Sequence, residues 1–171
     1  EHTRHNLGFR VLDLLAEQAH VDFVKSRNYK SFVTKGEIAD QTVMLMKPQT
    51  YMNSSGDAVR LIYDGTYIPL EHFLVVCDDF QLPHGKLRIR RMGSSGGHHG
   101  LQSIIDRLGS NKFARLRLGL GASAGGDYRK FVLNNFTKVE EKQNKEILDR
   151  ATEAIQCWLA YGVDKCMARF N

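Results

Sequence analysis

Short apolar runs alternate along the chain with segments of helical period, and this alternation constrains the fold more than any other feature. The clearest run is Phe73–Cys77, in "FLVVC". An uninterrupted apolar run of this length, followed by a turn signal, indicates a strand buried on both faces of a sheet. Further strands are predicted at 29–33, 38–46, 87–92 and 116–120, the first two forming a hairpin around Lys35 and Gly36.

Helical segments separate these strands. Near the start, apolar residues recur at a spacing of three or four from Phe9 to Ala19, and Thr3 or Asn6 can cap that helix. Further helices are predicted after residues 50–53, over 101–108 and, as a long amphipathic helix, over 139–161. The chain of 171 residues is therefore expected to be one α/β domain, with a mixed twisted β-sheet covered by helices on both faces.

Two adjacent carboxylates, Asp78 and Asp79, end the Phe73–Cys77 strand. Ligands of α/β sheets gather at the carboxyl ends of strands, where a carboxylate can orient a catalytic imidazole or bind a metal. The simpler interpretation is that both residues begin a turn, because Asp hydrogen-bonds to its own backbone there.

Three histidines are candidates for such an imidazole. His5 precedes the first predicted helix, and His98 and His99 lie in "MGSSGGHHGLQSI", a glycine-rich loop that enters a helix. Loops of this kind expose backbone N–H groups that can hold an anion. The alternatives are an exposed polar residue for His5 and a flexible connection for the loop. His84, in the turn "LPHG", is expected to be only exposed.

An amide and several arginines complete the candidates. Asn53, in "KPQTYMNSSG", can either cap the following helix or face a cleft. Arg88 and Arg90 alternate in "KLRIRR", so that both point to one face of a strand, and Arg117 comes from another strand. Without further evidence these arginines indicate a solvated strand face.

Composition limits the partners. The 24 Lys and Arg against 19 Asp and Glu give a net charge of +5, which permits a polyanionic partner without requiring one. Three cysteines without a CxxC spacing favour a reduced compartment and no disulfide framework. With no apolar run of 18 residues and no visible targeting signal, we expect a cytoplasmic protein that does not contact a membrane.

Six segments together resemble bacterial-type peptidyl-tRNA hydrolases. They are "TRHNLGF", "KPQTYMNSSG", "VVCDDFQLPHGKLRIR", "GSSGGHHGLQSI", "RLRLGLG" and "FVLNNF", and they occur in this order over most of the chain. The resemblance implies an enzyme with the fold of that family. It would hydrolyse the ester between a peptide and the 3′-terminal ribose of tRNA, and so recycle tRNA from aborted translation.

The resemblance also implies the roles of individual residues. His5 would be the general base that takes a proton from the attacking water, and Asp78 would orient it, with no metal and no organic cofactor. Asn53 would contact the peptide main chain, beside Met52 and Tyr51, while His98 and His99 border the cleft. The donor to the oxyanion would be Asn53 or the loop over 96–99.

The resemblance assigns the nucleic-acid side to three arginines, Arg88, Arg90 and Arg117. Arg90 and Arg117 would clamp the 5′-phosphate of the tRNA, with Arg88 nearby. Asp79 matches a less specific acidic position and is expected to be a solvated turn residue. The family pattern further implies a monomer.

Two departures from the family pattern keep alternatives open. The sequence begins after the family's first strand and its Gly-x-Gly-Asn-Pro-Gly loop, which carries an active-site Asn, so 1–171 is expected to be a single domain lacking them. His99 stands where the family usually has Asn. The chain could therefore be a noncatalytic RNA-binding module on the same fold. A third interpretation makes His5, Asp78 and His98 a metal site.

Overall fold

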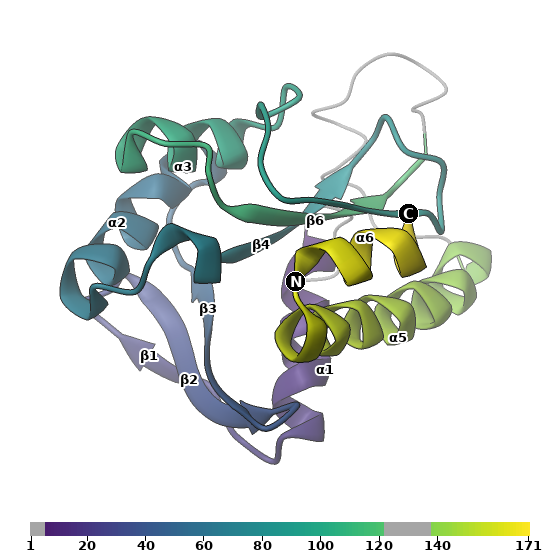
Figure 1. Cartoon of the computed structure of the whole chain (residues 1–171), viewed down its shortest axis with the longest axis horizontal. Helices are drawn as coiled ribbons and strands as arrows, with labels where there is room; N and C mark the ends of the chain where they lie inside the picture. Colours follow the sequence, from purple (N-terminus) through teal and green to yellow (C-terminus); the bar gives the residue numbers. More distant parts are fainter. Residues whose placement is uncertain (1–5, 122–137) are drawn as a thin grey trace.

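The strands among the described residues form two three-stranded sheets, which Figure 1 shows with their covering helices. The computed structural model describes residues 6–121 and 138–171. The outer sheet is an antiparallel meander in the order β1-β2-β3, with bounds Val24–Ser26, Ser31–Ile38 and Gln41–Pro48. The central sheet has the order β4-β6-β5, with bounds Leu74–Asp79, Ala114–Gly119 and Leu87–Arg90. Its β4 and β6 are parallel and β5 is antiparallel, so the mixed α/β class is confirmed.

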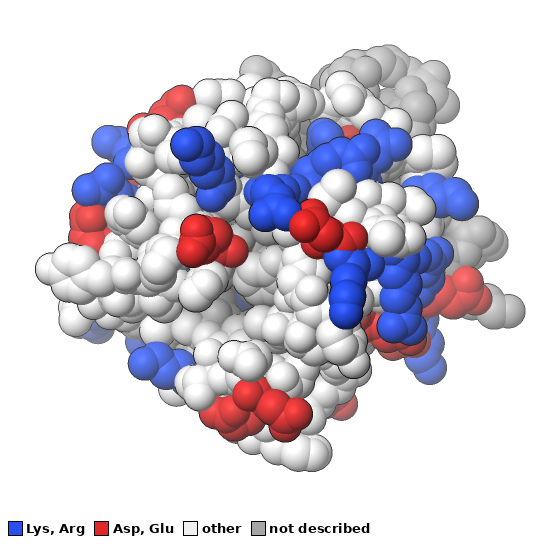
Figure 2. All heavy atoms as spheres, viewed as in Figure 1, with Lys and Arg blue, Asp and Glu red and all other residues white. Residues whose placement is uncertain are grey.

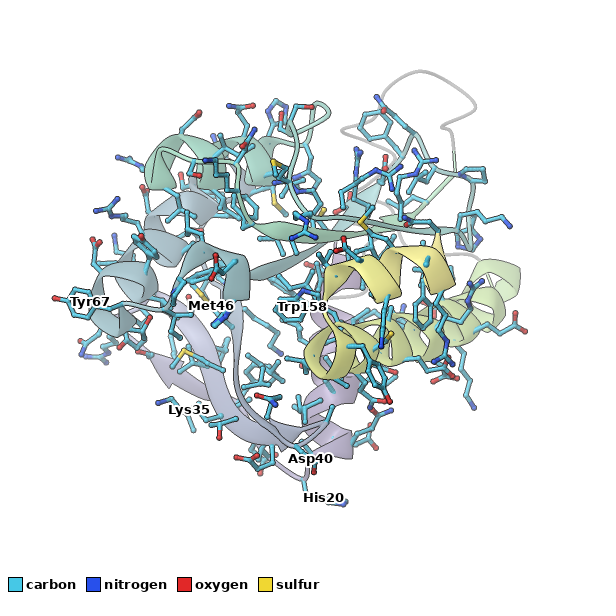
Figure 3. The ribbon with its side chains drawn as sticks, viewed as in Figure 1. His20, Lys35, Asp40, Met46, Tyr67 and Trp158 are labelled. Carbon is cyan, nitrogen blue, oxygen red and sulfur yellow. The ribbon has the colours of Figure 1, made fainter. Side chains whose placement is uncertain are left out.

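The hairpin between β2 and β3 turns at Ala39 and Asp40, where both residues have positive φ angles of 51° and 57°. The predicted turn at Lys35 and Gly36 is wrong, because both residues pair with β3 from inside β2. Figure 3 shows Asp40 at the hairpin tip, away from Lys35. A Cβ on Gly36 would lie 3.2 Å from a methyl group of Val21. The glycine therefore serves a close approach, and Asp, which tolerates the left-handed region, makes the turn.

The predicted helices are confirmed within the described residues. They are α1 (Leu7–Gln18), α2 (Ser55–Thr66), α3 (His99–Leu108) and α5 (Lys138–Tyr161). The structure adds helix α6 (Val163–Phe170) and the short 3₁₀ turns η2 (Met52–Ser54) and η3 (Leu70–His72), which were not predicted. Within the same ranges, none of them combines the length and the apolar character that a membrane span requires.

Helices cover both faces of the central sheet (Figure 1). On one face, apolar residues of β5 and β6 such as Ile89, Leu116 and Leu118 belong to a core cluster with α1, α5 and α6. On the other face, Cys77 of β4 packs with Leu101 and other apolar residues of α2 and α3. The prediction of a sheet covered on both sides is therefore confirmed, and the carboxyl end of β4 lies between the two helical layers.

Candidate active site

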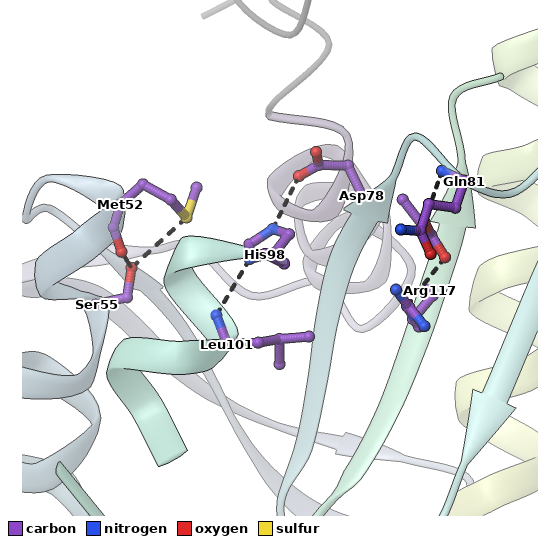
Figure 4. Close-up of polar contacts among 8 residues, drawn as sticks. Met52, Ser55, Asp78, Gln81, His98, Leu101 and Arg117 are labelled. Carbon is purple, nitrogen blue, oxygen red and sulfur yellow. Dashed lines mark hydrogen bonds and ion pairs between the residues drawn. The ribbon is translucent and has the colours of Figure 1, made fainter. Parts of the chain in front are cut away.

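His98 and Asp78 meet at the carboxyl end of β4, as Figure 4 shows. His98 is the N-cap of α3, and its Nδ1 accepts a hydrogen bond of 3.1 Å from the backbone N–H of Leu101. Its Nε2 lies 3.3 Å from Oδ1 of Asp78. Because Nδ1 is already an acceptor, the proton of the neutral imidazole sits on Nε2 and points to the carboxylate. The helix cap thus sets the tautomer of His98.

Asp78 and Asp79 are both buried, each with 4% of its surface exposed. The strand continues through both residues, which pair with Leu118 and Gly119, so their side chains lie on opposite faces of the sheet. Oδ2 of Asp79 forms an ion pair of 3.0 Å with Nε of Arg117, and its Oδ1 accepts from the backbone N–H of Gln81 at 2.9 Å. The expectation that Asp79 is a solvated turn residue is therefore wrong.

His5 lies outside the described residues, so its partnership with Asp78 stays a prediction. The start of the helix that follows it is described, and Gly8 packs directly on β4. A Cβ there would lie 2.7 Å from the carbonyl oxygen of Val76. Because Gly8 has no side chain, the beginning of α1 can lie close to β4, the strand that carries Asp78.

Met52 lies beside His98. A Cβ on Gly100 would lie 2.5 Å from Sδ of Met52 and 2.9 Å from Cε1 of His98, so this glycine lets η2 approach α3. Ser55 donates a hydrogen bond of 2.9 Å to the carbonyl oxygen of Met52 and fixes the turn. That Met52 forms part of the wall of a substrate pocket stays a prediction.

Asn53, inside this turn, and Tyr51, just before it, are exposed. Asn53 lines a polar groove of about 340 Å³ together with Ser103, Asp106 and Arg107 of α3. Tyr51 is 87% exposed. Together with Gln49, Thr50 and Ser54 it lines a hollow of about 490 Å³. His98 and Asp78 line neither space, so contact of Asn53 or Tyr51 with the same substrate atoms stays a prediction. His99, the first residue of α3, is also exposed.

Four arginines share one face of the central sheet, and we call them the arginine face: Arg88, Arg90, Arg115 and Arg117. Across the antiparallel pair, Arg88 lies directly opposite Arg117, and Arg90 lies opposite Arg115. Like charges in directly opposed positions destabilise a sheet, which makes this arrangement costly unless an anion or other polar groups compensate it. Arg88 and Arg90 are exposed. Arg88, Arg90 and Arg117 thus lie on one face, and their contact with tRNA stays a prediction.

Arg115 is the member of this face that sequence analysis missed. It is 2% exposed, and its guanidinium donates to the carbonyl oxygens of Gly93, Ser94, Asn111 and Phe113. Burial lowers the pKa of this guanidinium from its ordinary value. The alternation with Arg117 in "RLRLG" places Arg115 on the same strand face, but nothing in the sequence shows that the preceding loop folds back over it.

His84 is another residue whose environment differs from the expectation. It is half-buried, and its Nε2 lies 3.1 Å from Oδ1 of Asn144, a fully buried residue of α5. The expectation of a merely exposed His84 is wrong, because the turn "LPHG" packs against that helix.

Basic side chains also gather around α6 on the face shown in Figure 2.

Metal ligation finds no support in the part of the chain that the structure describes. Within residues 6–121 and 138–171, no group of three or more His, Cys, Asp or Glu is arranged to hold a metal ion. The hypothetical site of His5, Asp78 and His98 includes a residue outside these ranges. At the end of β4, Asp78 instead contacts the imidazole of His98, and Asp79 contacts the guanidinium of Arg117.

Comparison with known proteins gives one consistent result. Residues 1–171 match the family model described as peptidyl-tRNA hydrolase. A peptidyl-tRNA hydrolase of Carboxydothermus hydrogenoformans is 46% identical over 171 residues, covering 100% of this chain and 91% of the relative. One from Synechocystis is 43% identical over 172 residues, covering 100% and 89%. The crystal structure of peptidyl-tRNA hydrolase from Acinetobacter baumannii is similar with a TM-score of 0.93 and 27% identity, over 99% of this chain and 87% of that one.

Proposed function

The chain belongs to the peptidyl-tRNA hydrolase family, and from this membership we infer that it is an enzyme that hydrolyses the ester bond between a peptide and tRNA. The products are a free peptide and a tRNA with a free 3′-terminal ribose, which returns to translation. The cell compartment that fits such a substrate is the cytoplasm, and we expect the enzyme to act there as a monomer.

The observation that carries the catalytic proposal is the buried carboxylate of Asp78 at the end of β4. A carboxylate in this environment can hold an imidazole in one orientation and favour its charged form during the reaction. We propose that Asp78 does this for His5, which takes a proton from water while the water oxygen attacks the ester carbonyl. The proton is then given to the ribose oxygen that leaves. His98, held by Leu101 and Asp78, keeps the carboxylate in place.

The carbonyl oxygen becomes an anion in the transition state and needs hydrogen-bond donors. The N-terminal turn of α3, which begins at His99, presents backbone N–H groups and the positive end of the helix dipole. The amide of Asn53 is the second candidate donor. Met52, packed against His98, would form the wall of the site, and Tyr51 and His99 would border the bound peptide.

The arginine face provides the proposed tRNA contact. A row of guanidinium groups recognises phosphate without reading base sequence, which suits an enzyme that acts on many tRNAs. We assign the 5′-phosphate to Arg90 and Arg117, with Arg88 beside Arg117. The partner of the protein is therefore peptidyl-tRNA, through both its peptide and its nucleic acid.

Single-turnover hydrolysis of an N-acylated aminoacyl-tRNA tests this function. His5→Ala and Asp78→Asn should each reduce the rate, His5→Ala by about 10²- to 10⁴-fold, because a general base is lost or misplaced. His72→Ala and Asp64→Asn are the matched controls, since both residues are exposed and lie outside the site. A chelator should leave the parent rate unchanged.

Two results would contradict the proposal. Binding of the tRNA without any cleavage would favour the noncatalytic RNA-binding alternative. A loss of activity on chelation that is restored by adding a divalent metal would favour the metal site.

A further inference from the structure

Asp79 has no part in the chemistry described above, yet it is as buried as Asp78. Its two oxygens are both engaged: Oδ1 accepts from the backbone N–H of Gln81 at 2.9 Å, and Oδ2 pairs with Nε of Arg117 at 3.0 Å. Gln81 lies two residues after the end of β4, so the first contact fixes the carboxylate with respect to the start of the turn. The second contact fixes Arg117 with respect to the carboxylate.

The atom of Arg117 that Asp79 holds matters for recognition. A guanidinium group presents Nε and two terminal nitrogens, and a phosphate can be bound by the terminal pair. The ion pair with Asp79 is made at Nε, so it does not occupy the two terminal nitrogens of Arg117. The side chain of Arg117 is 17% exposed, so a small part of it is accessible to a ligand.

Gly96, in the glycine-rich loop, covers the guanidinium of Arg117. A Cβ on Gly96 would lie 2.6 Å from Nη2 and 3.4 Å from Cζ of Arg117, and the φ angle of Gly96 is +58°. Both facts require glycine at this position. The loop backbone therefore rests directly on the group that is proposed to bind phosphate.

The same loop ends at His98, two residues later. His98 contacts Asp78 through its side chain, and its backbone N–H donates to the carbonyl oxygen of Ser95 at 3.1 Å. The segment between Gly96 and His98 is thus short and closed by a backbone hydrogen bond. A displacement of Arg117 would be transmitted through Gly96 to the loop that holds His98.

We propose that Asp79 is a positioning residue: it orients Arg117 so that a tRNA 5′-phosphate bound there also fixes the loop that carries His98 against Asp78. The two adjacent acids of β4 then act on opposite ends of one loop. Asp78 contacts His98 at one end, and Asp79 holds Arg117 beneath Gly96 at the other. Recognition of the 5′-phosphate therefore raises kcat as well as affinity. This inference rests on the proposed hydrolase function.

The test compares one substrate in two forms, N-acetyl-aminoacyl-tRNA with its 5′-phosphate and the same tRNA after phosphatase treatment. Asp79→Asn keeps the volume and an acceptor for Gln81 but removes the charge that pairs with Arg117. We expect the ratio of kcat between the two forms to fall by about threefold or more. KM for the phosphorylated form should stay equal or decrease, because Arg117 keeps its charge. Asp64→Asn, an exposed acid of α2 paired with Arg60, is the matched control.

Gly96→Ala approaches the same contact from the loop. Its added methyl group pushes the guanidinium of Arg117 aside while Asp79 is intact, so the same fall in the kcat ratio is expected. This variant decides the question if Asp79→Asn does not fold, as judged by circular dichroism and thermal unfolding.

Three outcomes would overturn the inference, and they separate it from the proposed function. If the parent cleaves both forms with equal kcat, or if the variants lose activity equally on both, Asp79 has only a structural role while the hydrolase function stands. If the variants act on KM alone, Asp79 tunes affinity and does not position the loop. If the parent cleaves neither form, the hydrolase function fails, and the inference fails with it.

Discussion

The two faces of the central sheet are made from alternate residues of the same strands, but they are stabilised by different interactions. One face buries leucine and isoleucine side chains against α1, α5 and α6. The arginine face instead places like charges opposite each other and relies on Asp79 and on backbone carbonyls of the loop before α3. The apolar face can therefore be judged by stability alone, whereas changes on the arginine face should affect stability and activity together.

The largest effect on stability is expected on the apolar face. Leu116 is fully buried at the centre of β6. Leu116→Ala should reduce the free energy of unfolding by about 3–5 kcal/mol, because it removes buried methyl groups and leaves a cavity. Urea unfolding followed by circular dichroism measures this loss, with Leu61→Ala, on the exposed side of α2, as the control. The catalytic rate per folded molecule should be unchanged, and a large fall in that rate would remove the distinction between the faces.

Arg115 should behave differently from Leu116. Arg115→Met leaves the carbonyl oxygens of Gly93 and Ser94 without their donor, at a cost of about 2 kcal/mol in the free energy of unfolding. Because these carbonyls belong to the loop that leads to His98, the single-turnover rate should also decrease. Arg91→Met is a suitable control, since Arg91 is exposed and pairs with Asp164 at the surface.

The outcome for Arg115→Lys sharpens this prediction. Lysine keeps the charge but cannot spread its donors over carbonyls from both the loop and the segment before β6. Only partial recovery of stability and rate is therefore expected. Full recovery of stability and rate by lysine would show that the positive charge, and not the several N–H donors of the guanidinium, holds the loop.

The strands and helices were predictable because apolar spacing is a local property of the sequence. The strand end at Asp78 and the helices on both sides of it followed from that spacing. The hairpin turn did not, because Gly36 packs closely against Val21, a contact between segments distant in sequence. Glycine is favoured both in turns and where two segments pack closely, and the sequence alone does not distinguish these two roles.

The candidate site residues came from motifs, and their roles stay predictions. The structure places His98 in contact with Asp78 and Met52 beside His98, while His5 lies outside the described residues. No local pattern indicates that Asp79 is buried beside Arg117 or that Arg115 lies beneath a loop. Both facts depend on the pairing of β4, β5 and β6, which is set by contacts between distant parts of the chain.

The smallest expected effect on stability comes from two buried thiols, one in the core on each side of the central sheet. Cys77 of β4 packs with α2 and α3, and Cys166 of α6 belongs to the core of the apolar face. Burial is the main cause that raises the pKa of each thiol, that of Cys166 to about 12, and the charge of Asp78 raises that of Cys77 further. Both thiols are therefore neutral in the folded protein at pH values where an unfolded chain already ionises them.

The sign of the resulting pH dependence follows from these raised pKa values. A thiol with a raised pKa contributes its full stability below its unfolded value, near pH 9, and loses it as pH rises toward the folded value. Each thiol should lower the free energy of unfolding by about 1.4 kcal/mol per pH unit above that point. Cys166→Ala and Cys77→Ala, measured against the parent by urea unfolding at pH 7 and pH 10, should each flatten the decline. An equal decline in parent and variants would show that the thiols ionise in the folded protein as they do in the unfolded chain.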